Sequence, residues 1–156
     1  MLSGMVVSWY VRKDPKILGV LAPAAFLVEI GKVLISQYVI NENLTESFAK
    51  AIEDEGVQAA EQTIVGATTA EVSGALFSHW KFESDLIDVV QNCDTPEKAD
   101  PKNRKAAQSL HVIRTIVGLH CQITEQNLQE AKELIAAYGL DEESFEQMIQ
   151  QIQGIE

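Results

Sequence analysis

The stretch ILGVLAPAAFLVEIGKVLISQYVI at residues 17–40 constrains this chain more than any other feature. Its only charged residues are Glu29 and Lys32. At about 100° of rotation per residue, its apolar side chains would surround a helix on nearly every side, so such a helix has to be covered all round. The cover could come from the rest of the domain, from a second copy or partner protein, or from a membrane surface. Pro23 should kink or split the helix.

Signals for helix ends recur along the rest of the chain. Asp or Thr directly before Pro is typical of a helix N-terminus, as at Asp14, Thr95 and Asp100. The predicted helices are 5–12, 15–40, 44–64, 69–92, 101–122, 124–138 and 141–153. Residues 5–13 are too short a run for periodicity to separate helix from strand. We therefore expect an all-α fold: a single-domain helical bundle of about six helices around a central apolar helix at residues 17–40.

Size and charge limit the classes of function. A chain of 156 residues fits one domain over residues 1–156, with a possible loop between subregions at 92–103. The net charge of −11 should repel nucleic acid, so we expect no nucleic-acid partner. The longest uncharged run, residues 17–28, is shorter than the ~20 residues that span a bilayer, so we expect no integral membrane span. Cys93 and Cys121 are too few for a disulfide framework, which favours reduced thiols and a cytoplasmic location.

The segment SLHVIRTIVGLHC, residues 109–121, raises the question of a metal site. On a helix, nine residues separate His111 from His120 by half a turn, so the two rings point in opposite directions and cannot share an ion. We expect His111 in water and His120 on the inward face. His79 and Glu83 have workable metal spacing, but a surface ion pair is the simpler interpretation. We expect no metal site, no cofactor and no assigned catalytic residue, since phosphate-binding and catalytic motifs are absent from the sequence.

Small and aromatic side chains suggest two kinds of binding site. Gly56 and Ala60 share a face of the 44–64 helix, which either packs closely on the central helix or forms a slot for a flat ligand. Together with Trp80 and His120 they are the candidate ligand-binding residues. Several aromatic residues lie in the apolar N-terminal region or off the main apolar stripe of their helix, and these are the candidate interface residues: Trp9, Tyr10, Phe26, Phe77 and Phe82.

These features favour a non-enzymatic protein–protein interaction module of the adaptor, chaperone, inhibitor or immunity type. Its partner would be another protein chain, and we expect a homodimer, because the apolar surface of residues 5–40 exceeds what one copy can shelter. One alternative is a helical carrier or sensor for a hydrophobic or flat small molecule. A second alternative is an enzyme with a histidine as its acid or base, which would need His120 or His79 in a polar cleft.

Overall fold

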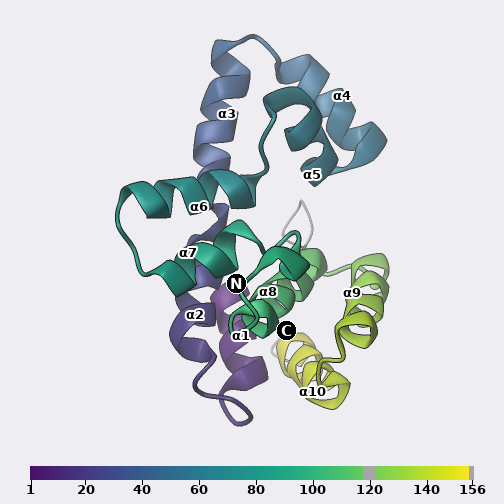
Figure 1. The fold of residues 1–156 in the computed structure, drawn as a ribbon. Helices are drawn as coiled ribbons and strands as arrows, with labels where there is room; N and C mark the ends of the chain where they lie inside the picture. The colour runs from purple at the N-terminus through teal and green to yellow at the C-terminus, as the bar shows by residue number, and fades with distance from the viewer. Residues whose placement is uncertain (118–121, 155–156) are drawn as a thin grey trace.

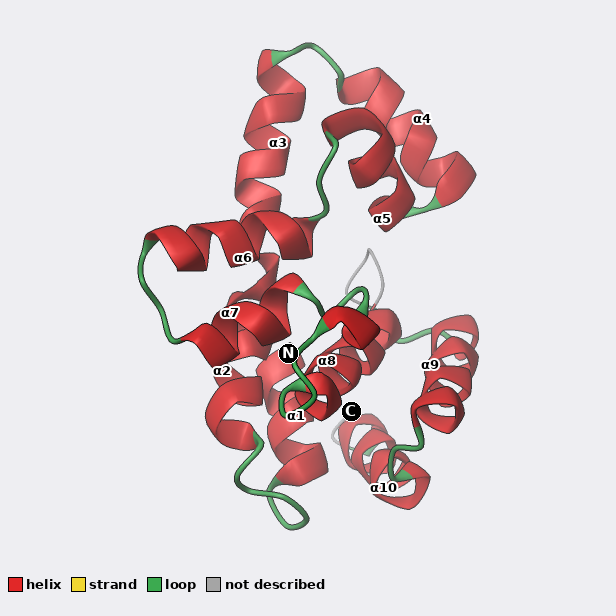
Figure 2. Ribbon diagram, viewed as in Figure 1, coloured by secondary structure: helices red, strands yellow, loops and turns green. Residues whose placement is uncertain are grey.

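The computed structural model describes residues 1–117 and 122–154, and within them every regular element is a helix (Figure 2). The all-α fold class is confirmed. Residues 2–10 are helical, which answers the question left open for residues 5–13. The α-helices are α1 (Leu2–Tyr10), α2 (Leu18–Leu27), α3 (Gly31–Asn41), α4 (Thr45–Glu55), α5 (Val57–Ala60), α6 (Thr69–His79), α7 (Ser84–Gln91), α8 (Arg104–Val117), α9 (Glu125–Tyr138) and α10 (Glu142–Gln153). Three short turns of other helix types are η1 (Val28–Ile30), η2 (Glu61–Val65) and η3 (Pro96–Lys98).

Two predicted helices are each divided by a turn. The 44–64 helix ends at Gly56, whose φ of +84° is a conformation that suits glycine, and α5 begins at the next residue. The 69–92 helix ends at His79, and Lys81 takes a φ of +57° in the turn that leads to α7. The break at Gly56 could be predicted from the glycine. The composition of residues 80–83 gives no signal for the break between α6 and α7.

The core of the molecule is built around α8, which contacts α1, α2, α7 and α9. The inward face of α8 is fully covered, so this helix, and not the predicted 17–40 helix, occupies the centre. The apolar stretch at residues 17–40 contributes only its first half, α2, to this core. The residues that α8 buries are Ala106, Ala107, Ser109, Leu110, Val112, Ile113, Ile116 and Val117.

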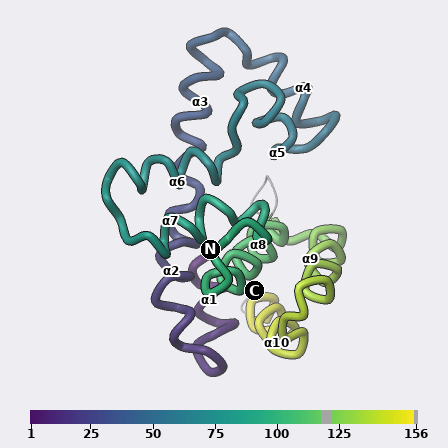
Figure 3. Tube along the Cα trace, in the orientation of Figure 1, coloured from purple at the N-terminus to yellow at the C-terminus, as the bar shows by residue number. Residues whose placement is uncertain are grey.

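The apolar rod runs from Leu18 to Asn41 as a continuous helical stretch of 24 residues. Figure 3 shows its trace passing from α2 into α3 without a loop. Pro23 lies inside α2, and the departure from α-helical geometry comes further on, at η1. By length and composition alone this stretch could cross a membrane, and it is the one such helix in the described part of the chain; 33% of its most apolar window is buried in the fold.

The second half of the rod leaves the core and supports a lobe formed by α3, α4, α5 and η2 (Figure 1). The lobe is thinly packed: none of the eleven described residues of α4 is fully buried. The 44–64 region packs on the 17–40 helix, one of the two alternatives predicted from its small-residue face. The half of the helix that it contacts, α3, protrudes from the core.

Close contacts with α6 hold the lobe at the base of α3. The amide of Gly31 donates to Ser73 Oγ at 2.8 Å, and Ser73 Oγ donates to the Val28 carbonyl oxygen at 2.6 Å. A Cβ at Gly31 would collide with the Thr69 carbonyl oxygen, so only glycine allows this approach. The buried Glu61 carboxylate accepts from the Thr69 amide at 2.6 Å and from the Thr69 hydroxyl at 2.5 Å. These bonds tie η1 and η2 to the first turns of α6.

A second tie joins the rod to α8. Arg114 Nε donates to Glu29 Oε1 at 2.8 Å, and Arg114 Nη1 contacts both Asp94 and Cys93 Sγ, the latter at 3.3 Å. Burial alone would raise the pKa of Glu29, but the charges of Arg114 and Lys32 outweigh it and hold that pKa below its ordinary value. Burial raises the pKa of the Cys93 thiol to about 12, so this cysteine stays protonated and unreactive.

Candidate functional site

The most exposed apolar side chains lie along one side of the rod. Phe26, Val33 and Ile40 are 77%, 68% and 62% exposed, and they are the three most exposed large hydrophobic residues in the described parts of the chain. We call these three residues the α2–α3 stripe. Each is seven residues from the next, a spacing that repeats nearly in phase on a helix. The stripe is about 21 Å long, since fourteen residues rise about 1.5 Å each.

Helical geometry explains why the stripe is exposed. The opposite side of the rod buries Val28, Gly31, Ile35 and Val39 against α6 and the lobe. The 3-10 turn η1 rotates α2 relative to α3 by only some tens of degrees, which keeps Phe26 on the same side as Val33. One rod therefore has a buried face and an apolar face that the described chain leaves open.

Within the rod, the charges beside the stripe are limited to one ion pair. Gln37 lies between Val33 and Ile40, and its amide donates to Asn41 Oδ1 at 2.9 Å. Leu34 and Tyr38, both exposed, extend the apolar surface to one side. The two charged residues of the rod, Glu29 and Lys32, form an ion pair with each other. A partner that docks on the stripe therefore meets apolar and neutral side chains of the rod together with this one ion pair.

A second exposed apolar feature is the turn between α6 and α7. Trp80 and Phe82 are roughly half exposed, and both rings pack on the buried ring of Phe77, with centroid distances of 6.3 Å and 5.2 Å. Trp80 and Phe82 also meet edge to face at 6.1 Å. Phe77 thus anchors a pair of aromatic rings at the surface.

The candidate interface residues separate into two groups. Phe26 and Phe82 are exposed. Trp9, Tyr10 and Phe77 are between 0% and 4% exposed, so the prediction that they face a partner is wrong for these three. They pack inside the chain's own core. Sequence reasoning missed Val33 and Ile40 as surface residues, although the spacing of seven from Phe26 was a signal that could have identified them.

The predicted ligand slot is not assembled by the described residues. Gly56 is exposed in the turn between α4 and α5, Ala60 is buried in α5, and Trp80 lies in the turn between α6 and α7. His120 lies outside the described residues. His111 was expected in water, but its Nδ1 is 2.8 Å from the Tyr138 hydroxyl, and burial lowers its pKa.

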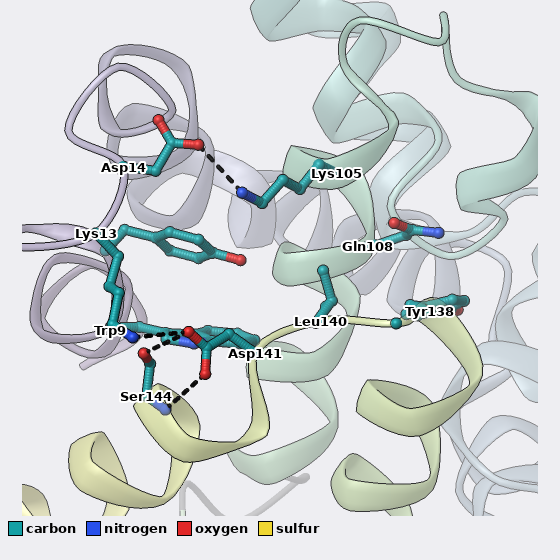
Figure 4. Close-up of a pocket in the computed structure, with 11 residues that line it drawn as sticks. Trp9, Lys13, Asp14, Lys105, Gln108, Tyr138, Leu140, Asp141 and Ser144 are labelled. Carbon is teal, nitrogen blue, oxygen red and sulfur yellow. Dashed lines mark hydrogen bonds and ion pairs between the residues drawn. The ribbon is translucent and has the colours of Figure 1, made fainter.

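A groove of about 530 Å³ lies elsewhere, between α1, α8 and the turn from α9 to α10 (Figure 4). Trp9 and Tyr10 line it, and the Tyr10 hydroxyl is 2.6 Å from Ser109 Oγ. Its two lysines are each neutralised by an aspartate: Lys13 Nζ lies 2.9 Å from Asp141, and Lys105 Nζ lies 3.1 Å from Asp14.

These ion pairs indicate that the groove is a junction between helices and not an ion-binding site. Because the charges cancel, no unpaired charge is left to hold an ion. The Ser144 amide and then Lys13 lower the pKa of Asp141 to about 2, so Asp141 is ionised at any ordinary pH. Asp141 also caps α10, since it accepts from the Ser144 amide at 3.1 Å. The groove therefore marks where α10 closes onto α1.

Metal-ligating side chains do not gather in the described regions. His79 ends α6 and Glu83 directly precedes α7, so a turn separates two residues that the sequence placed on one helical face. Within residues 1–117 and 122–154, no group of three or more His, Cys, Asp or Glu side chains is arranged to hold a metal ion.

The architecture is that of an all-helical module whose most exposed apolar feature is a helical stripe. The chain belongs to the HDOD domain family, whose model matches residues 12–96. This region runs from the end of α1 through α7 and contains the whole α2–α3 stripe. No curated protein matches the sequence.

Among solved structures, the fold is similar to the crystal structure of a virulence factor from Campylobacter jejuni subsp. jejuni. The TM-score is 0.75 at 22% sequence identity, and the match covers 94% of this chain and 57% of that chain. This likeness shows the fold alone. It extends beyond the region that the family model matches, so at least part of α8–α10 belongs to the shared architecture. The chain spans little more than half the length of that protein.

Proposed function

We propose that this chain is a non-enzymatic protein-interaction module that docks another protein on the α2–α3 stripe. One observation carries the proposal: the three most exposed large hydrophobic residues of the described chain are regularly spaced along one side of one rod. Single exposed apolar residues are ordinary, whereas an aligned set on a rigid element is typical of a binding surface.

The chemistry of the stripe favours a protein as the partner. An apolar helical face with anchors seven residues apart fits the packing of one helix against another. Nucleic acid would need basic side chains, and the chain has a net charge of −11. A helix that lies on a membrane surface usually carries several Lys or Arg residues on its polar face, and this rod carries only Lys32.

Site-specific photocrosslinking in the native cell tests the proposal. The substitution Val33→benzoylphenylalanine places the crosslinker at the middle of the stripe. Val11→benzoylphenylalanine is the matched control, because Val11 is an exposed valine at the end of α1 and lies outside the stripe.

We expect protein adducts from position 33, no matching adducts from position 11, and loss of the adducts when Ile40→Lys is added. Adducts that persist with Ile40→Lys, or that form equally from both positions, would show that the stripe is not a docking surface.

A further inference from the structure

We infer that the occupant of the α2–α3 stripe is a second copy of this chain, with the stripes of two copies packed antiparallel and Val33 at the two-fold axis. This inference rests on the proposed function, since it names the partner at the same site. Three features of the rod support it: its charge, the symmetry of its spacing and the buried support behind it.

Charge makes the rod the most suitable place for two copies to meet. The chain carries −11, and two such chains repel each other over most of their surfaces. Residues 18–41 contain one acid and one base, Glu29 and Lys32, which pair with each other, so the whole net charge lies on the rest of the chain. The rod therefore adds no net charge to a contact along the stripe.

The spacing of the stripe is symmetric. Val33 lies midway between Phe26 and Ile40, seven residues from each. A two-fold axis through Val33, perpendicular to the rod, therefore places Phe26 of one copy beside Ile40 of the other, and the reverse at the far end. Each pair combines a bulky ring with a smaller side chain, and the two helix dipoles run in opposite directions. A surface that contacts itself in this way is the usual form of a two-fold dimer interface.

The rod presents the stripe on a rigid support. Gly31, Ile35 and Val39 pack on the inner side, and the Gly31–Ser73 and Arg114–Glu29 bonds fix the rod to α6 and α8. Little conformational entropy is then lost on association, which favours binding by a small surface. Because the stripe is short, we expect a dissociation constant in the micromolar range, typical of interfaces below about 1,200 Å².

Sedimentation velocity over roughly 1 to 200 µM, a range chosen to bracket such micromolar constants, is the first test. We expect the wild-type chain to pass from 17.2 kDa monomer to dimer within this range. Val33→Lys should weaken dimerisation at least tenfold, because it buries a charge beside its own symmetry mate. Val11→Lys, the same change at an exposed valine outside the stripe, should leave the dimer unchanged. Circular dichroism shows that each variant is folded.

Disulfide trapping tests the register, in a Cys121→Ser background that leaves only the buried Cys93. Val33→Cys should form a crosslinked dimer with itself. Phe26→Cys and Ile40→Cys should crosslink when mixed and not when alone. Crosslinking of Phe26→Cys alone would indicate parallel rods and overturn the proposed register.

A wild-type chain that stays monomeric up to roughly 200 µM, the highest concentration in the sedimentation experiment, would overturn the inference that a second copy occupies the stripe. The proposed function is judged separately. If the chain stays monomeric, adducts at position 33 with a different protein, lost with Ile40→Lys, would still support docking on the stripe. If position 33 gives no specific adducts and the chain is also monomeric, both proposals fail.

Discussion

Replacing Arg114 with Met should destabilise the fold strongly, because Arg114 joins α8 to two other segments of the chain. Its guanidinium contacts Glu29 in η1, Asp94 after α7 and the Cys93 sulfur, and its side chain is only 16% exposed. Met keeps most of the length and the apolar stem but removes the charge. The two carboxylates then remain in place without their main counter-charge.

The magnitude follows from how well each carboxylate is covered. Breaking a buried ion pair by removing one partner costs about 3–5 kcal/mol. Glu29 keeps Lys32 as a partner and is 32% exposed, so most of its loss is offset. Asp94 is 13% exposed and Arg114 is the cation that contacts it, so its loss dominates. We therefore expect a decrease of about 3 kcal/mol in the free energy of unfolding, at the lower end of that range.

Urea denaturation followed by circular dichroism at pH 7 measures this change. Arg114→Lys is the matched control, since it retains the charge but loses the planar guanidinium that contacts Glu29 and Asp94 at once. It should lower the free energy of unfolding by about 1 kcal/mol. Adding Asp94→Asn to Arg114→Met should recover part of the loss, because the stranded charge is then gone. A loss below about 1 kcal/mol for Arg114→Met would refute the reasoning that the pair is effectively buried.

The same pair predicts a pH dependence of definite sign. The folded-state pKa of Glu29 is lowered, by Arg114 and Lys32 acting against burial. A lowered carboxyl pKa stabilises the fold above the unfolded value of about 4.3, and this contribution is lost as the pH falls through the folded value. The wild-type chain and Arg114→Met should therefore differ most above pH ~5 and converge in acid.

Two further predictions concern the attachment of the lobe. Gly31→Ala should destabilise by more than 1 kcal/mol in thermal or urea unfolding, since the added Cβ would meet the Thr69 carbonyl and Ser73 Oγ; a neutral result would show that α6 can move away easily. Burial raises the pKa of Glu61, so its ionisation weakens the fold as the pH rises above about 4.3. Glu61→Gln can still accept from the Thr69 amide through its Oε1, and its Nε2 can donate to the Thr69 hydroxyl, so this variant should remove that decline at a change below about 1 kcal/mol. Glu61→Ala should lose about 1–3 kcal/mol, and equal losses in the two variants would contradict a hydrogen-bonding role.

The sequence by itself determined the helical class and many of the helix ends, because a helix end with a cap or a glycine is set by local chemistry. The predicted helix starts at residues 69 and 141 and the predicted end at residue 138 agree with the structure to within one residue. Thr68 caps α6 by accepting from the Glu71 amide, Asp141 caps α10 by accepting from the Ser144 amide, and Gly139 ends α9 in the left-handed conformation. The all-α class followed from these signals and from the periodicity between them. The sequence also predicted an apolar surplus in the rod at residues 17–40.

Only the tertiary structure decided which side of each helix is covered. Trp9 and Phe77 lie in the core while Phe26 and Trp80 lie at the surface, although all four are aromatic residues in apolar segments. The covered side depends on which helices meet, and here α8 takes the centre while the second half of the rod extends into a lobe. Packing partners distant in sequence, such as Ser73 beneath Gly31 and Arg114 beside Glu29, fix that choice, and no local pattern encodes them.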